Sequence, residues 1–455
     1  MNVLAIMGAI KRLLLLVSFV NISISAYSQI VSLSDSIPIL TLGQCVNYAM
    51  QHQPALNRAF INRSIVRTTN AINLSGWLPQ VSISGNLTHY IQLPSAFASN
   101  QSGTGTPAQT RSTFVNTFVP ELSVSQTIFN PQLLYAARIS PLYSEQAEQI
   151  IDSSKINIVT SVSKSFYNLL LTLEQVNILK EDTTRLGRSI VDAYKQYIGG
   201  IVDETDNEQA IITFNNSKAQ LFQQIENIGS AYANLKQIMG YPPEKHFNVT
   251  FDTAKMMQEI AFDTVPLLQY EKRIEYQQLQ TVRKLQHQLT TYHTLSILPT
   301  ISAFYNYNYE YASNTASTLF SNAYPYSYVG LSLNIPLFTG FSRMENIHKS
   351  KLQEQDIDWA EIGLKSEIYS EYTTTLANYR SNRYNWHLLK ENEMRAKNVY
   401  NIILLQYQQG IVPYLNLIVA ESNLITAEIG YSNALFQLLF SKIDLEKAIG
   451  IIPYH

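Results

Sequence analysis

Two short stretches decide the fold: QYIGGIV at residues 196–202 and QYQQGIV at residues 406–412. They lie in segments without proline, 142–241 and 337–412, and proline disrupts helix interiors. Glycine is common just after a helix ends, and Gly200 and Gly410 lie 210 positions apart. Gly240 and Gly450 repeat the offset. The chain is therefore predicted to be an internal repeat, in which each half has a long helix that turns into a shorter one.

Apolar residues before each turn recur at three- and four-residue intervals, a spacing typical of coiled-coil helices. In the first half these residues are Val159, Val162, Phe166, Leu169, Leu173 and Val176. Long helices are expected over about 132–197 and 341–407, each spanning roughly 100 Å at 1.5 Å per residue. Shorter helices are expected after the turns, over about 203–239 and 413–449, and before the strands, over about 41–77 and 265–297.

Four segments alternate apolar and polar residues with the period of a β-strand: 81–90, 121–128, 301–311 and 329–335. Their length fits a transmembrane β-strand, and the sequence leaves open which face of the first strand meets lipid. An ordinary soluble hairpin with an apolar face is the alternative. Membrane barrels need at least about eight strands. A closed barrel would therefore be shared, with eight strands from two chains or twelve from three.

Tyrosines are frequent in the third and fourth of these segments. We interpret them as an interfacial aromatic girdle or barrel wall, with a sugar-stacking platform as the alternative. The residues are Tyr305, Tyr307, Tyr309, Tyr311, Tyr326 and Tyr328.

Composition excludes several classes of function. Charged residues are 15% and the net charge is −2, so the basic face that nucleic acid requires is not expected. The single cysteine, Cys45, excludes an intramolecular disulfide framework and a cysteine-based zinc site. The sequence contains no His-Glu-x-x-His motif, no Gly-x-Ser-x-Gly elbow and no P-loop. We therefore expect no enzyme activity, no cofactor and no metal.

The N-terminus is predicted to be a signal peptide over residues 1–28. Lys11 and Arg12 precede an apolar run at 13–20, and Ala26-Tyr27-Ser28 supplies small residues for cleavage. A membrane anchor is the alternative, but the run is shorter than the ~20 residues of a spanning helix.

These features resemble the TolC-like outer-membrane efflux protein family over essentially the whole mature chain. The opening helix is similar at Leu42, Gln44, Val46, Tyr48, Ala49, Pro54 and Leu56. The other similar segments are Val265-Pro266-Leu267, LFTGFSR at 337–343, Tyr407 with Gly410, and Ala448-Ile449-Gly450. The resemblance implies a mainly α fold with a small β part. It implies a homotrimer with a shared twelve-stranded barrel in the outer membrane of a Gram-negative bacterium, above a periplasmic α-barrel. A periplasmic adaptor and an inner-membrane pump would dock at the tips.

The resemblance also implies a gate at the helical tips. Its tyrosine falls on Tyr407, with Tyr197 as the repeat mate, and its acid falls on Asp206, with Asn416 as the mate. The tip turns are at Gly200 and Gly410. The family's arginine falls on Val412 and a further acid falls on Val419, so a second-half ion-pair latch is not expected. For the two tyrosines, packing between helices is the alternative to gating.

The first tip carries four acids: Asp203, Glu204, Asp206 and Glu208. Three copies would crowd carboxylates around one aperture, which would attract cations. The alternative is a solvated helix start, because acidic residues suit helix N-termini.

The expected organisation is a signal peptide (1–28), a first repeat (29–242), a linker (243–264) and a second repeat (265–455). The expected function is a passive duct of a tripartite efflux system. A duct for type I protein secretion and an exported coiled-coil structural or adhesion protein are the alternatives.

Overall fold

The computed structural model describes residues 38–92, 95–97, 109–111, 114–200, 203–250 and 267–453. The expected signal peptide, most of the loop after the first strand and the linker from residue 251 onward lie outside these ranges. The chain divides into two units. The smaller comprises 1–39 and 246–248, in which the Asn248 N–H donates to the Pro38 carbonyl at 2.9 Å. Every other feature below belongs to the larger unit, unless stated.

The chain is mainly helical with a small β part, as expected. The helices are α2 (Leu42–His52), α3 (Pro54–Leu74), α4 (Pro131–Ile198), α5 (Glu204–Met239), α7 (Ile274–Leu295), α8 (Ser342–Gln408) and α9 (Tyr414–Ile449). The strands are β1 (Ile39–Leu40), β2 (Gln80–His89), β3 (Ser95–Phe97), β4 (Gln109–Arg111), β5 (Asn116–Phe129), β6 (Asn248–Val249), β7 (Thr300–Ser313) and β8 (Ala323–Asn334). Short 3₁₀ turns lie at 75–77, 270–272 and 316–318.

The long helices α4 and α8 confirm the predicted ranges to within a few residues. The helices before the strands differ from the prediction. The expected helix over 41–77 is broken between α2 and α3, because Pro54 forces Gln53 into an extended conformation (φ −65°, ψ 120°). Helix α7 begins at Ile274, nine residues later than expected. The boundaries of the repeats remain predictions.

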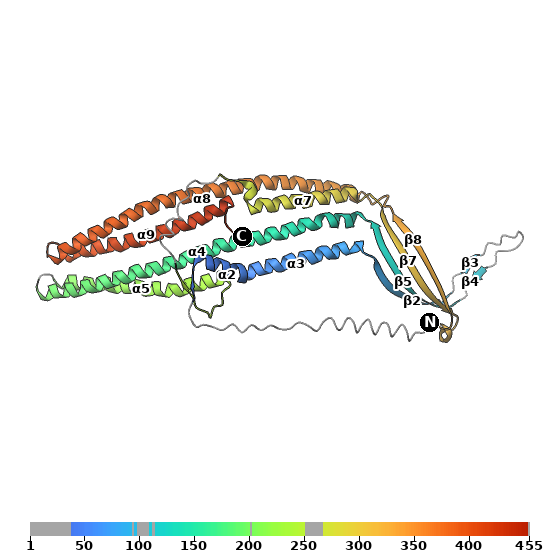
Figure 1. The fold of residues 1–455 in the computed structure, drawn as a ribbon, viewed down its shortest axis with the longest axis horizontal. Helices are drawn as coiled ribbons and strands as arrows, with labels where there is room; N and C mark the ends of the chain where they lie inside the picture. Colours follow the sequence, from blue (N-terminus) through green and yellow to red (C-terminus); the bar gives the residue numbers. More distant parts are fainter. Residues whose placement is uncertain are drawn as a thin grey trace. The chain divides into compact units, whose positions relative to one another are not determined.

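Two helical hairpins form the core, α4 with α5 and α8 with α9, and α4 packs against α9 to join them (Figure 1). The most buried side chains come from the middle of α4 and the C-terminal half of α9, where Tyr167 packs against Phe436. Helix α3 lies on α4, and α7 lies between α4 and α8. Among the described residues, no helix has both the length and the hydropathy needed to cross a bilayer.

The two halves have matching joints where the short helices end. Gly240 and Gly450 have left-handed backbones (φ 68° and 73°), and a side chain at either would press on the carbonyl oxygen of His52 or Lys272. In the first half the Gln53 amide donates to the Ile238 carbonyl at 3.2 Å. In the second, Arg273 Nη1 donates to the Ala448 carbonyl at 2.8 Å. The repeat therefore extends to tertiary contacts.

The main sheet has the order β2-β5-β7-β8, with antiparallel pairs throughout. The register places the apolar residues on one face: Val81, Ile83, Leu87, Phe118, Leu122, Val124, Tyr305, Tyr307, Tyr311, Val329, Leu331 and Leu333. Several of these are strongly exposed, including Ile83 (81%) and Val329 (78%). The outer edges of β2 and β8 pair with no strand of the described chain.

The tyrosines of the sheet divide between its two faces. Tyr305, Tyr307, Tyr309 and Tyr311 lie on the apolar face. Tyr326 and Tyr328 are paired with Asn308 and Asn306, on the polar face, and Asn306 Nδ2 donates to the Tyr328 hydroxyl at 2.9 Å. If all six tyrosines belong to a girdle or barrel wall, four of them contribute from the apolar face of the sheet and two from the polar face.

Candidate functional site at the helical tips

The first tip joins α4 to α5. Helix α4 ends at Ile198, and Gly200 adopts the left-handed conformation (φ 68°) that glycine tolerates best. Ile201 and Val202 lie outside the described residues. Asp203 then caps α5, accepting a hydrogen bond from the Thr205 N–H at 3.0 Å and another from the Thr205 hydroxyl.

The four acids of this tip are oriented largely toward solvent. Asp203, Glu204 and Glu208 are exposed, and Asp206 is half-buried. The Thr205 hydroxyl bond lowers the pKa of Asp203, whereas partial burial and the charge of Asp203 raise the pKa of Asp206. No group of His, Cys, Asp and Glu within the described residues could hold a metal ion. Within one chain, the acids therefore form a charged helix start, and their meeting at an aperture stays a prediction.

The second tip joins α8 to α9. Gly410 is left-handed (φ 69°), and the Ile411 N–H closes the helix end by donating to the Gln406 carbonyl at 2.9 Å. Pro413 precedes α9 in an extended conformation. The predicted gate residue Asn416 is exposed on the first turn of α9.

Tyr407 is buried in an apolar cluster that unites both tips. Its ring lies 5.6 Å from that of Tyr414, a residue that the sequence did not single out. The cluster comprises Ala193 of α4, Ala210 of α5, Tyr400 and Tyr407 of α8, and Tyr414, Leu417, Ala420 and Leu424 of α9. Tyr197, the predicted repeat mate of Tyr407, is only half-buried and lies outside this cluster. The two predicted tyrosines therefore have different environments.

The hydroxyls of Tyr407 and Tyr414 are buried, and neither has a hydrogen-bond partner among the described residues. Burial, with smaller effects from the charges of Asp192 and Asp206, raises the pKa of Tyr407 to about 12. Burial, followed by the charge of Glu421, raises the pKa of Tyr414 further. Both rings therefore stay neutral, and two unpaired hydroxyls burden the packed tip.

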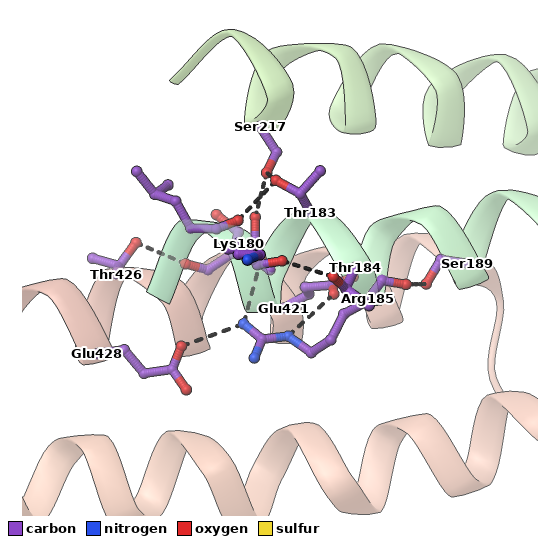
Figure 2. A network of polar contacts seen from close by, with 12 residues as sticks. Lys180, Thr183, Thr184, Arg185, Ser189, Ser217, Glu421, Thr426 and Glu428 are labelled. Carbon is purple, nitrogen blue, oxygen red and sulfur yellow. Dashed lines mark hydrogen bonds and ion pairs between the residues drawn. The ribbon is translucent and has the colours of Figure 1, made fainter. Parts of the chain in front are cut away.

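A charged network lies farther from the turns along α4 and α9, and Figure 2 shows Arg185 reaching toward Glu421 and Glu428 in it. We call it the Arg185 cluster: Arg185 and Asp182 of α4, and Glu421 and Glu428 of α9. The Arg185 guanidinium lies 3.5 Å from Asp182, 3.7 Å from Glu421 and 3.3 Å from Glu428. Ser217 of α5 donates to Asp182 at 2.7 Å, and the Tyr400 ring of α8 lies 5.9 Å from the guanidinium carbon. The network thus touches all four helices of the tips.

Three carboxylates face one guanidinium in this cluster, and all three have raised pKa values. Burial, followed by the charge of Asp182, raises the pKa of Glu421 to about 7. Burial also raises the pKa values of Asp182 and Glu428, although Arg185 opposes it. Neither carboxylate oxygen of Glu421 accepts a hydrogen bond within the described structure. Glu421 is therefore the group least compensated as an anion.

A groove of about 570 Å³ runs beside the cluster between α5 and α9, with α4 behind it. Asp182, Ser217 and Glu421 contribute to its lining, together with apolar side chains such as Ile418 and Ile425.

A signal for the Arg185 cluster was present in the sequence. Asp182 stands between Leu179 and Leu186 at the three- and four-residue spacing of the buried seam of α4. Glu421 and Glu428 occupy the corresponding seam of α9, after Tyr414 and Leu417. A carboxylate at a seam position requires a buried partner.

The family profile described as "Outer membrane efflux protein" matches this chain over residues 45–241 and 296–451. These two segments correspond to the two halves of the repeat. The chain belongs to the outer membrane efflux protein family. Members of this family are channels of the outer membrane.

Solved structures agree with this fold. The outer membrane protein VceC from Vibrio cholerae has a TM-score of 0.70 at 15% identity, with 90% of this chain and 96% of that chain covered. The outer membrane channel CmeC of Campylobacter jejuni has a TM-score of 0.71 at 17% identity, with 94% of this chain and 93% of that chain covered. The open state of the MtrE outer membrane channel of Neisseria gonorrhoeae has a TM-score of 0.69 at 15% identity, with 93% of this chain and 94% of that chain covered. No curated protein matches the sequence.

Proposed function

We propose that three copies of this efflux-family chain form a passive duct through the outer membrane of a Gram-negative bacterium. The duct would export small toxic molecules. Its helical part would lie in the periplasm, where an adaptor and an inner-membrane pump would dock at the tips and supply the energy. The tips would act as the gate.

The observation that carries this proposal is the four-stranded sheet. Its apolar face is exposed on all four strands, and its outer edges at β2 and β8 are unpaired within the described chain. An unpaired edge cannot remain in lipid, because its backbone groups would lack hydrogen-bond partners. Closure with neighbouring copies satisfies both edges, and three copies give twelve strands.

The tips support a gate in a more limited way. One apolar cluster holds the α8–α9 hairpin against the α4–α5 hairpin, and Tyr407 lies inside it. Widening by separation of the two hairpins of one chain would break this contact. We therefore propose Tyr407 and Tyr414 as gate residues. Tyr197, Asn416 and the four tip acids remain secondary candidates.

The test is negative-stain imaging of the mature protein extracted from outer membrane in detergent, with conductance of the same sample in planar bilayers. We expect three-fold particles with a central channel, roughly 130–140 Å long from ~100 Å of helix and a ~30–40 Å membrane part. We also expect detergent-dependent solubility and a conductance step. Compact particles, or a protein that is soluble without detergent, would contradict the shared barrel.

A further inference from the structure

The Arg185 cluster crosses the contact between the two hairpins. Asp182 and Arg185 belong to α4, whereas Glu421 and Glu428 belong to α9. The side chain of Arg185 is 18% exposed and that of Glu421 is 3% exposed, so the charges are removed from water only while α9 lies on α4. Parting of the hairpins would return them to solvent.

The charges of this cluster do not balance. One guanidinium faces three carboxylates, and Glu421 receives only the long 3.7 Å contact from Arg185 Nε, without a hydrogen bond. A buried anion with so little compensation favours either neutralisation or exposure. A proton on Glu421 supplies the missing neutralisation without a change in packing.

Among the residues that the structure describes, the surroundings add no further cation in direct contact with the three carboxylates. The charged and titratable groups that face the cluster are Glu181, Asp182, Arg185 and Arg188 from α4, Glu393 and Tyr400 from α8, and Tyr414 and Glu428 from α9. Helix α5 contributes the uncharged Ser217. Arg188 opposes the rise in the pKa of Tyr400, and within the described structure it forms no ion pair with the three carboxylates.

We infer that the Arg185 cluster is a pH-responsive clamp, which holds the α8–α9 hairpin against the α4–α5 hairpin at acidic pH and releases it as pH rises toward neutrality. That this release widens the duct rests on the proposed function; the clamp itself does not.

The direction follows from which state binds the proton more tightly. Glu421 has a pKa of about 7 in the packed state and would return toward its ordinary 4.5 once exposed. A group whose pKa is raised by packing stabilises the packed state fully below the lower value. That stabilisation is lost as pH rises through the higher value. The raised pKa values of Asp182 and Glu428 act in the same direction.

The size of the effect follows from the same two values. Between pH 4.5 and pH 7 the ratio of packed to parted hairpins falls about tenfold per pH unit. The total change from Glu421 alone is therefore on the order of several hundred-fold. Outside this window Glu421 adds no further pH dependence.

The experiment measures how often the contact opens. In a Cys45→Ala background, Ala420→Cys places a thiol in the apolar cluster at the tips, since Ala420 belongs to that cluster and is 4% exposed. Leu415→Cys provides an exposed reference thiol on the same helix. The purified full-length protein in detergent is modified with a maleimide from pH 4.5 to pH 8, and the rate for the Ala420→Cys protein is divided by the rate for the Leu415→Cys protein. The division removes the common dependence of thiol ionisation on pH.

We expect the ratio to rise by about two orders of magnitude between pH 4.5 and pH 7. Glu421→Gln, which mimics the protonated side chain, should keep the ratio low and remove most of the rise, with only the smaller contribution of Asp182 and Glu428 left. The matched control is Asp444→Asn, because Lys164 and Asp444 also bridge α4 and α9, at 2.5 Å, but are solvent-exposed. This control should keep the full pH dependence.

A flat ratio in the proteins with an unchanged Arg185 cluster would overturn the inference. This measurement does not depend on whether a variant of the cluster folds. A rise of undiminished size in Glu421→Gln would overturn it as well. Bilayer conductance of the same proteins separates the two proposals. If the thiol ratio responds to pH and the conductance does not, the clamp stands and the gating role of the tips fails.

Discussion

Replacing Tyr414 by phenylalanine should stabilise the packed tip. The Tyr414 hydroxyl is buried and makes no hydrogen bond within the described structure. A buried hydroxyl without a partner costs about 1–3 kcal/mol. Phenylalanine fills nearly the same volume and keeps the ring contact with Tyr407, 5.6 Å away. We expect a gain of about 1–2 kcal/mol, which is roughly a 5–30-fold shift toward the packed state.

The assay is amide hydrogen exchange in the purified protein at constant pH, followed in peptides from residues 414–424. Exchange there should slow by roughly 5–30-fold if it requires the tip to open. Tyr276→Phe is the matched control, because the Tyr276 hydroxyl donates to Glu361 at 3.1 Å. Its removal should speed exchange in α7 and leave α9 unchanged.

The opposite result at Tyr414 would refute this reasoning. If Tyr414→Phe speeds exchange over 414–424 while the control behaves as expected, the hydroxyl has a partner in the assembled protein. Tyr414 would then hold the tip by a hydrogen bond, and not by ring packing alone.

Three further predictions follow from the charges, the turns and the sheet. Arg185→Met removes the only cation in contact with the three carboxylates within the described residues, so thermal unfolding at pH 8 should show a loss of about 3–5 kcal/mol in the free energy of unfolding. At pH 5, where carboxylates with raised pKa values are protonated, this loss should be smaller, and equal losses at the two pH values would contradict the raised pKa values. Gly450→Ala should destabilise more than Gly410→Ala, because both backbones are left-handed but only at Gly450 would the new Cβ lie 2.9 Å from a carbonyl oxygen; comparison of the two melting temperatures is the check. Ile83→Lys on the apolar face should sharply reduce recovery from the outer membrane, since a lysine there costs up to about 2–4 kcal/mol, whereas Ser84→Lys on the opposite face should be tolerated; equal recovery would remove the lipid-facing assignment.

The helices were predictable because they depend on local sequence. The three- and four-residue spacing set the range 132–197, and the structure has Pro131–Ile198, with Pro141 inside the helix. The turn glycines were predictable for the same reason, since Gly200 and Gly410 both require positive φ. The break at Gln53 was equally local and was missed, although Pro54 disfavours a helical residue before it.

The features that were not predicted depend on pairing between distant segments. The sequence could not show which tyrosines share a face, because that depends on the register of β7 on β8. The register places Tyr328 opposite Asn306, on the other face of the sheet from Tyr305. The equivalence of Tyr197 and Tyr407 followed from the repeat in the sequence. Burial differs between them because only the α8–α9 turn contributes its tyrosine to the shared cluster.

The distribution of polar groups along the hairpin contact separates a rigid part from a part suited to movement. Where the C-terminal half of α9 meets α4, most of the buried residues are apolar, as at Leu438 and Leu439, and the buried polar ones are mainly small serines and threonines. Toward the tips the same seam contains the Arg185 cluster and then the unpaired hydroxyls of Tyr407 and Tyr414. Each of these groups is less costly in water than in the packed state, so each lowers the free energy needed to part the hairpins. Regions that open locally are those with the fewest compensated contacts. The buried charges and unpaired hydroxyls thus lie at the tip end of the contact, where a duct gated at its tips would have to widen.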